Sequence, residues 1–184
     1  MTGATEMNRK HIIAIIALTL CTVLGIVAAS ALSRDKRSAK TDVPEDFSFA
    51  ITWNVFGISS YDSATGTLVK TTDATHPEDY VATHYINEKE AGRVWQLIQK
   101  LDIESYPDEY DPNPGMRSEP PMTLILTVRT ADGEKTVKAE GIAMSYESTD
   151  EKGQKFLDTC RAIEEILTDT EEWKALPEYE FFYE

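Results

Sequence analysis

The longest run of apolar residues lies near the start of the chain, where residues 12–32 contain no charged side chain. An α-helix of about 20 apolar residues crosses the hydrocarbon core of a bilayer, and it satisfies its own backbone hydrogen bonds there. The pattern therefore predicts a membrane-spanning anchor over residues 12–32, with the lipid bilayer as its partner. A short tail, residues 1–11, precedes this helix, and a charged linker, residues 33–46, follows it.

Two other interpretations of this run stay open. A basic start at residues 9–10 and a small-residue site at residues 29–31 also fit a cleavable signal peptide, although the run is longer than such a signal needs. A lipoprotein signal is the other alternative, because Leu18 precedes Cys21 by three residues. Leu20, however, is larger than the residue expected before a lipid-modified cysteine.

Basic residues on the two sides of the run bear on the orientation of the protein. Four of them lie at positions 34–40 and two at positions 9–10, so the positive-inside rule favours a cytoplasmic C-terminal domain. A first hydrophobic segment behind a short basic tail, in contrast, usually acts as an export signal. We expect export, which places the large domain on the extracytoplasmic side of a cell membrane.

After the linker the pattern changes to a period of two. In residues 47–53 the large apolar side chains share one face and the small ones the other: Phe47, Phe49, Ile51 and Trp53 against Ser48, Ala50 and Thr52. This alternation is typical of a half-buried strand. Strands are also predicted at residues 58–61 and 67–71, joined by a turn that ends at Gly66, and around residues 81–85.

A helical period follows. Asn87 and Glu90 have the spacing of a capping box, with asparagine in place of the usual serine or threonine. One stripe of the helix that they open is apolar: Ala91, Val94, Trp95, Ile98 and Leu101. The pattern predicts an amphipathic helix that ends near Leu101.

Two strands and two helices are predicted in the second half of the chain. Asp132-Gly133 is a strong hairpin signal between residues 122–129 and residues 134–139. A second amphipathic helix has the inner stripe Phe156, Cys160, Ile163 and Leu167, and a short third helix begins at Thr170. Hairpins dominate, so we expect an α+β domain over residues 47–184, an antiparallel sheet with two main helices packed on one face.

The charge of this domain is strongly negative. Residues 43–184 carry 12 basic and 29 acidic side chains, a net charge of −17. Such a surface repels nucleic acid and anionic lipid headgroups, and it lacks the basic patch that nucleic-acid binding requires. Cys160 is the only cysteine in this part of the sequence, so no disulfide forms within the domain.

Residues 102–121 are rich in proline and in acidic residues, and they form a loop longer than an ordinary connection. Carboxylate and carbonyl oxygens are the ligands that Ca²⁺ prefers. The candidate metal ligands are Asp108, Asp111 and Asn113. The loop does not match an EF-hand, because Gly115 comes one position early and Met122 takes the place of the final glutamate. We expect no cofactor; Ca²⁺ binding by these residues is the alternative to a solvated acidic loop.

Sequence motifs for catalysis are absent. The chain has no G-x-S-x-G, G-x-G-x-x-G or Walker sequence. We therefore expect a binding or interaction module rather than an enzyme. The two alternatives are a hydrolase that uses carboxylates of residues 102–119, with or without a divalent cation, and a structural component of the cell envelope.

The last residues of the chain are aromatic. Tyr179, Phe181, Phe182 and Tyr183 combine apolar surface with hydrogen-bonding groups, a composition enriched at protein interfaces. They are the candidate residues for binding a protein partner. The alternative is that they pack as an edge strand or beside Trp173.

Three segments resemble uncharacterised bacterial domains that are secreted or anchored in a membrane. They are FSFAITWNVFGISSYDSATGTLVK at residues 47–70, LDIESYPD at residues 101–108 and GQKFLDTC at residues 153–160. The resemblance covers residues 47–184 and implies a protein of the bacterial envelope. It implies no activity, cofactor or site residue.

Overall fold

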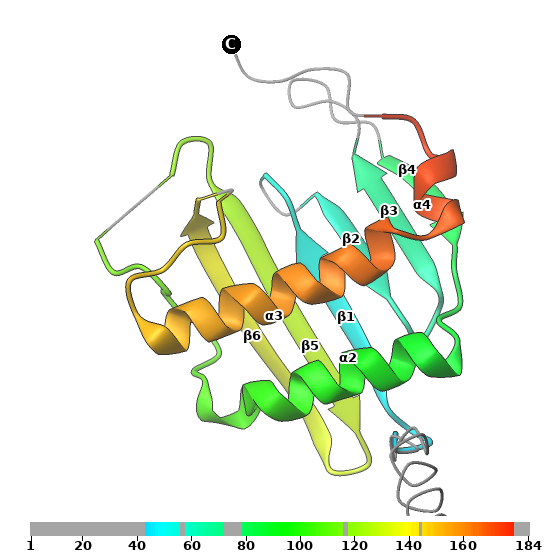
Figure 1. The fold of residues 1–184 in the computed structure, drawn as a ribbon, viewed down its shortest axis with the longest axis horizontal. Helices are drawn as coiled ribbons and strands as arrows, with labels where there is room; N and C mark the ends of the chain where they lie inside the picture. The colour runs from blue at the N-terminus through cyan, green and yellow to red at the C-terminus, as the bar shows by residue number, and fades with distance from the viewer. Residues whose placement is uncertain (1–42, 56–57, 72–78, 116–117, 144, 179–184) are drawn as a thin grey trace, which may run out of the picture. The chain divides into compact units, whose positions relative to one another are not determined.

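In the part of the chain that the computed structural model describes, six strands form one antiparallel sheet and helices pack on it (Figure 1). The structure describes residues 43–55, 58–71, 79–115, 118–143 and 145–178. The strands are β1 (Ser48–Trp53), β2 (Ser59–Asp62), β3 (Thr67–Thr71), β4 (Asp79–Thr83), β5 (Met122–Thr130) and β6 (Gly133–Ile142). Their order across the sheet is β4-β3-β2-β1-β5-β6, and the predicted α+β class is confirmed.

The helices are α2 (Glu88–Leu101), the 3₁₀ turn η1 (Ile103–Ser105), α3 (Glu151–Thr168) and α4 (Glu171–Ala175). Figure 1 shows α2 and α3 side by side on the same face of the sheet. The short helix α4 packs against the end of α3 and against β4. This face of the sheet is therefore covered.

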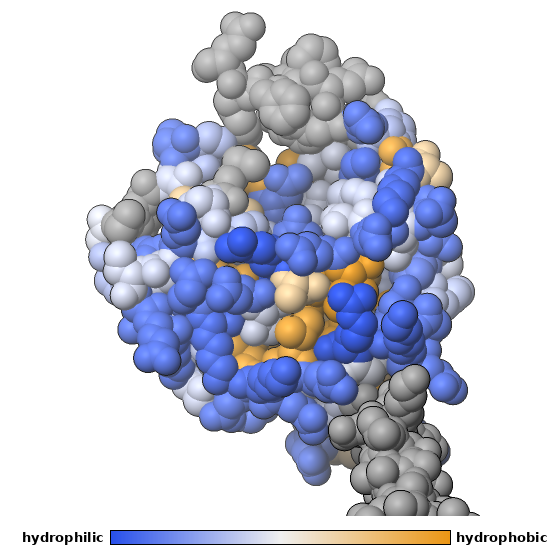
Figure 2. Space-filling model, viewed as in Figure 1, coloured by the Kyte–Doolittle hydropathy of each residue, from blue (hydrophilic) through white to orange (hydrophobic). Residues whose placement is uncertain are grey.

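Alternation along the strands decides which face is buried. Phe49, Ile51 and Trp53 of β1 are at most 2% exposed, whereas the residues between them are only partly buried. The inner stripe of α3 is fully buried at the predicted positions: Phe156, Cys160, Ile163 and Leu167. Figure 2 shows hydrophilic outer sides on α2 and α3, with a hydrophobic strip between the two helices. The core thus lies between the sheet and this pair of helices.

The predicted capping box at the start of α2 is confirmed. The Asn87 side chain accepts hydrogen bonds from the backbone N–H groups of Lys89 and Glu90, each at 3.0 Å. The Glu90 carboxylate in turn accepts the Asn87 N–H at 2.9 Å. A cap of this kind stabilises a helix by about 1 kcal/mol. The helix ends at Asp102, whose φ of 59° is in the left-handed region.

Two strands, β6 and β4, have ends that differ from the prediction by two residues or more. β6 continues past residue 139 to Ile142, because a register shift opposite residues 122–124 lets Met122 pair with Ile142. β4 ends at Thr83, so Tyr85 lies outside it. The partner strand β3 begins only at Thr67, and the Tyr85 ring instead covers Gly66, where a Cβ atom would lie 2.8 Å from Tyr85 Cε1.

Within the residues that the structure describes, no helix is long and apolar enough to cross a membrane. The anchor predicted at residues 12–32 lies outside those residues, as does most of the predicted linker. The membrane anchor therefore stays a prediction.

The start of α3 depends on a glycine. Asp150 caps the helix and accepts the Gly153 N–H at 2.7 Å. Gly153 is buried, and a Cβ atom there would lie 2.4 Å from Ser148 Oγ and 2.7 Å from the Pro112 carbonyl oxygen. Serine can turn away, but a backbone carbonyl can move only with its loop. The loop that holds Pro112 and the first turn of α3 therefore approach as closely as glycine allows.

We predict that Gly153→Ala destabilises the protein although alanine favours helices. Overpacking costs about 1–3 kcal/mol, which exceeds the gain of about 1 kcal/mol in helix propensity. Urea unfolding followed by circular dichroism measures the change. Lys155→Ala, at an exposed position of the same helix, is the control and should stay within about 0.5 kcal/mol of the parent. A Gly153→Ala protein as stable as the parent would contradict the close approach.

Candidate interaction surface

The long proline-rich loop lies along β6. The Asp108 carbonyl oxygen accepts the Lys138 N–H at 2.7 Å, and the Tyr110 N–H donates to the Lys138 carbonyl at 2.8 Å. Glu109 and Lys138 thus form a short parallel bridge. The Asp108 carboxylate also pairs with Lys135 Nζ at 2.5 Å. This candidate metal ligand is therefore engaged with the edge of the sheet.

Of the other two candidate ligands, Asn113 fastens the loop to the segment before α3, and Asp111 contacts Asn113. Asp111 Oδ1 accepts the Asn113 N–H at 2.9 Å. Asn113 is only 8% exposed, and its amide nitrogen donates to the Glu147 carbonyl at 2.6 Å. Beside it, Ser148 Oγ donates to the Pro112 carbonyl at 2.6 Å. The Asn113 amide thus joins two loops.

Metal binding by this loop stays a prediction. Among the described residues, no group of three or more His, Cys, Asp or Glu side chains is placed to hold a metal ion. Asp108, Asp111 and Asn113 each contact protein atoms, so a cation would have to compete with those contacts.

A second polar cluster lies between the 145–150 segment and α3. Tyr146, with φ of 56°, donates a hydrogen bond from its hydroxyl to Glu164, and Arg161 lies 5.1 Å over its ring. Burial raises the pKa of the Glu164 carboxyl, and the hydrogen bond from Tyr146 opposes that shift. Burial also raises the pKa of the Cys160 thiol, so the thiolate that a nucleophile needs is disfavoured. We interpret this cluster as a structural contact that holds the 145–150 segment against α3.

His84 connects three elements at the other end of the sheet. It follows β4 and is 9% exposed. Its Nδ1 lies 3.1 Å from Glu172 of α4, and its Nε2 lies 3.4 Å from Glu90 of α2. Both ring nitrogens thus face carboxylates, one from each helix. The histidine therefore ties α4 to the start of α2 beside β4.

The two edges of the sheet differ. Edge strands expose backbone N–H and C=O groups that can pair with another chain, and proteins usually cover or charge them. At the β6 edge, residues 108–110 bond to Lys138, and the Ser118 N–H donates to the Gly141 carbonyl at 3.3 Å. Lys135, Lys138 and Glu140 add charges there. The β6 edge is protected in both ways.

The β4 edge has a different character. The His84 N–H donates to the Gly66 carbonyl at 2.8 Å, just beyond the Thr67–Thr83 end of the β3–β4 ladder, in the manner of a hydrogen-bonded pair. Because such pairs alternate in antiparallel strands, the backbone groups of Asp79, Val81 and Thr83 point away from β3. The strand contains neither lysine nor proline. Val81 is 63% exposed and Tyr85, just beyond the strand, is 71% exposed. This edge is the candidate interaction surface.

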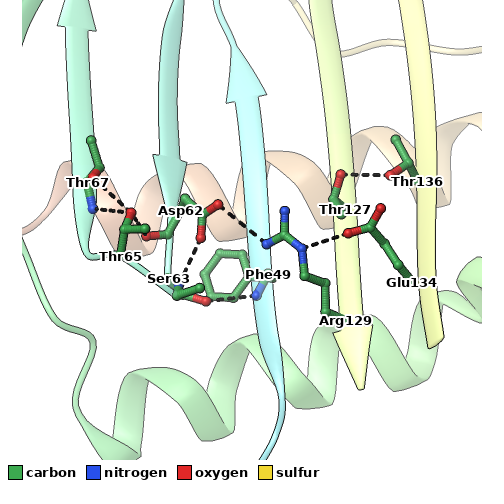
Figure 3. Close-up of polar contacts among 10 residues, drawn as sticks. Phe49, Asp62, Ser63, Thr65, Thr67, Thr127, Arg129, Glu134 and Thr136 are labelled. Atoms are coloured by element: carbon green, nitrogen blue, oxygen red, sulfur yellow. Dashed lines mark hydrogen bonds and ion pairs between the residues drawn. The ribbon is translucent and has the colours of Figure 1, made fainter. Parts of the chain in front are cut away.

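Side chains also join strands on the face of the sheet opposite the helices. Figure 3 shows Arg129 of β5 between Asp62 of β2, at 3.4 Å, and Glu134 of β6, at 2.8 Å. The hydroxyls of Thr127 and Thr136 lie 2.9 Å apart on the same face. These contacts join strands on both sides of β1. On this face the register of β2, β5 and β6 is therefore held by side chains as well as by the backbone.

Sequence patterns identify the strand but not its role. The sequence predicts a strand at Val81, yet the place of that strand at an edge depends on the order of the strands. The available signal is weak: β4 reads DYVAT, without the lysine or proline that often marks an edge. The four aromatic residues predicted to bind a partner, Tyr179, Phe181, Phe182 and Tyr183, lie outside the described residues.

No protein-family model matches this chain, and no curated protein is similar to it. Any functional interpretation therefore rests on the residues and their geometry.

We predict that Glu164→Gln changes how stability depends on pH. A group whose pKa is raised on folding stabilises the native state below its unfolded pKa, here 4.5, and that contribution is lost as pH rises through the folded pKa. Glutamine retains an acceptor for Tyr146 but cannot ionise. The free energy of unfolding of the variant, measured in urea, should therefore increase relative to that of the parent as pH rises from about 4.5 to about 8.

Asp132→Asn is the matched control, because Asp132 is exposed in the β5–β6 turn and asparagine suits the same turn. The difference in free energy of unfolding between Asp132→Asn and the parent should change little over the same pH range. A difference between Glu164→Gln and the parent that stays constant with pH would contradict the raised pKa.

Proposed function

We propose that this chain is a binding module that takes up an extended segment of a polypeptide partner as a strand added at the β4 edge. The observation that carries the proposal is the outward direction of the backbone groups of residues 79, 81 and 83, together with the 63% exposure of Val81. In strand addition, main-chain hydrogen bonds provide affinity and alternate side chains provide specificity.

The contrast between the edges supports this function. At the β6 edge a loop covers the strand and hinders pairing with another chain. At the β4 edge the strand has neither the lysine nor the proline that would hinder such pairing. Val81 adds an apolar contact at the middle of β4, and Tyr85 adds a second one beyond its end. Aromatic residues of this kind are enriched in the centres of interfaces.

The place of action that we propose is the extracytoplasmic side of a cell membrane. The apolar run at residues 12–32 supports an anchor, and the basic tail before it supports export. The net charge of −17 on residues 43–184 would keep the domain away from anionic headgroups and leave its surface accessible.

Photo-crosslinking tests the binding edge. With a benzophenone amino acid in place of Val81 in the full-length protein, irradiation of intact cells should give a discrete adduct, because a strand paired with β4 would contact this side chain. Gln99, exposed on α2, is the control position and should give none. Equal labelling at positions 81 and 99, or no adduct at position 81, would contradict strand addition at β4.

Protease treatment of spheroplasts tests the placement. An epitope after Glu184 should be digested from outside, and a fragment containing residues 12–32 should stay with the membrane. An epitope that is protected until the membrane is broken would show that the basic residues at positions 34–40 determine the orientation and that the domain is cytoplasmic.

A further inference from the structure

We infer that the strand taken up at the β4 edge is β4 of a second copy of this chain, paired antiparallel about Val81. This inference rests on the proposed function, because it names the partner for the same edge. It joins two six-stranded sheets into one continuous sheet with α2 and α3 of both copies on the same face.

The backbone of β4 suits pairing with itself. A two-fold axis normal to the sheet at Val81 places Val81 opposite its own copy and Asp79 opposite Thr83. All three residues point their backbone groups outward, so each of these pairs is of the hydrogen-bonded kind, and the strands would form about six N–H···O bonds. The two Val81 side chains would meet on the open face, which would remove the exposed surface of a residue that is 63% exposed in one copy.

The charges of β4 permit this register although the domain is acidic. Position 79 holds the one charged residue in the sequence of the strand, and in this register it pairs with position 83 rather than with its own copy. Residues 79 of the two copies lie four residues apart along the paired strands, about 13 Å, which exceeds the Debye length of about 8 Å at physiological salt. The remaining repulsion, including that of Glu171 and Glu172 on α4 beside β4, is of a kind that salt screens.

The sign of the salt effect separates this partner from a basic peptide. Two copies with net charge −17 on residues 43–184 repel each other, so their association should strengthen with salt. A basic segment would be attracted by the same charge, and its binding should weaken with salt. The membrane anchor that we propose would also confine both copies to one surface and raise their effective concentration.

Cysteine crosslinking tests the register directly. Val81→Cys is made in the full-length protein in membranes, with Cys21→Ser to remove the first cysteine; Cys160 is fully buried. Facing residues of a hydrogen-bonded antiparallel pair have Cα atoms about 5.5 Å apart, within the range of a disulfide. Mild oxidation should convert most of the protein to a dimer that a reducing agent separates. Val69→Cys is the matched control, because Val69 pairs with Val81 on the same face but one strand inward, and it should give no dimer.

Sedimentation equilibrium of the detergent-solubilised full-length protein gives the second measurement. The dimer fraction should rise between about 50 mM and about 500 mM salt, and Val81→Lys should reduce it to monomer without loss of the melting transition, because position 81 is exposed. Retention of the dimer by a folded Val81→Lys protein would overturn the inference.

The outcomes distinguish this inference from the proposed function. A photo-adduct at position 81 with the mass of two chains, together with a disulfide dimer of the Val81→Cys protein, supports both. An adduct at position 81 with another protein, and no disulfide dimer of the Val81→Cys protein, overturns the second-copy inference and leaves strand addition standing. The absence of any adduct at position 81 overturns both.

Discussion

The packing of β1 against the helices is the interaction on which the rest of the structure depends. β1 lies inside the sheet, and each of its ends joins a different helix through aromatic rings. The ring centroid of Phe47, just before the strand, lies 4.9 Å from that of Trp95 of α2. The ring centroid of Trp53, at the end of the strand, lies 5.4 Å from that of Trp173 of α4. Between them, Phe49 and Ile51 are at most 1% exposed. Aromatic side chains bury the largest areas, so this strand holds the sheet and the helices together.

A sheet covered on one face must hold its other face together by different means. Arg129 lies between carboxylates of β2 and β6, and two threonine hydroxyls join β5 and β6 (Figure 3). Exposed ion pairs contribute about 0–1 kcal/mol each, so they add little to stability. Their consequence is alignment: they favour one register across β2, β5 and β6.

Local patterns in the sequence predict most of the elements but not their arrangement. The alternation in residues 47–53, the capping box at Asn87 and the Asp132-Gly133 turn each depend on neighbours in the chain, and the structure confirms all three. The strand order depends instead on long-range pairings, which no local pattern encodes. Asn113 shows the same limit: its polarity suggests a metal ligand, but burial against Glu147, 34 residues away, gives its amide a structural contact.

The acidic loop and the candidate interaction surface both concern the edges of the sheet: the loop covers the β6 edge, and the surface lies at the β4 edge. Proline cannot donate to a ladder, and five of residues 102–121 are prolines. The stretch between Pro107 and Pro112 is free of proline, and that stretch bonds to β6. The loop is therefore long enough to reach the edge and regular enough to cover it over a few residues. Because this loop follows α2 at the β6 side of the sheet, it cannot also cover β4, five strands away. The absence of lysine and proline from β4 is consistent with pairing as a function of that strand, since either residue at position 81 would suffice to block it.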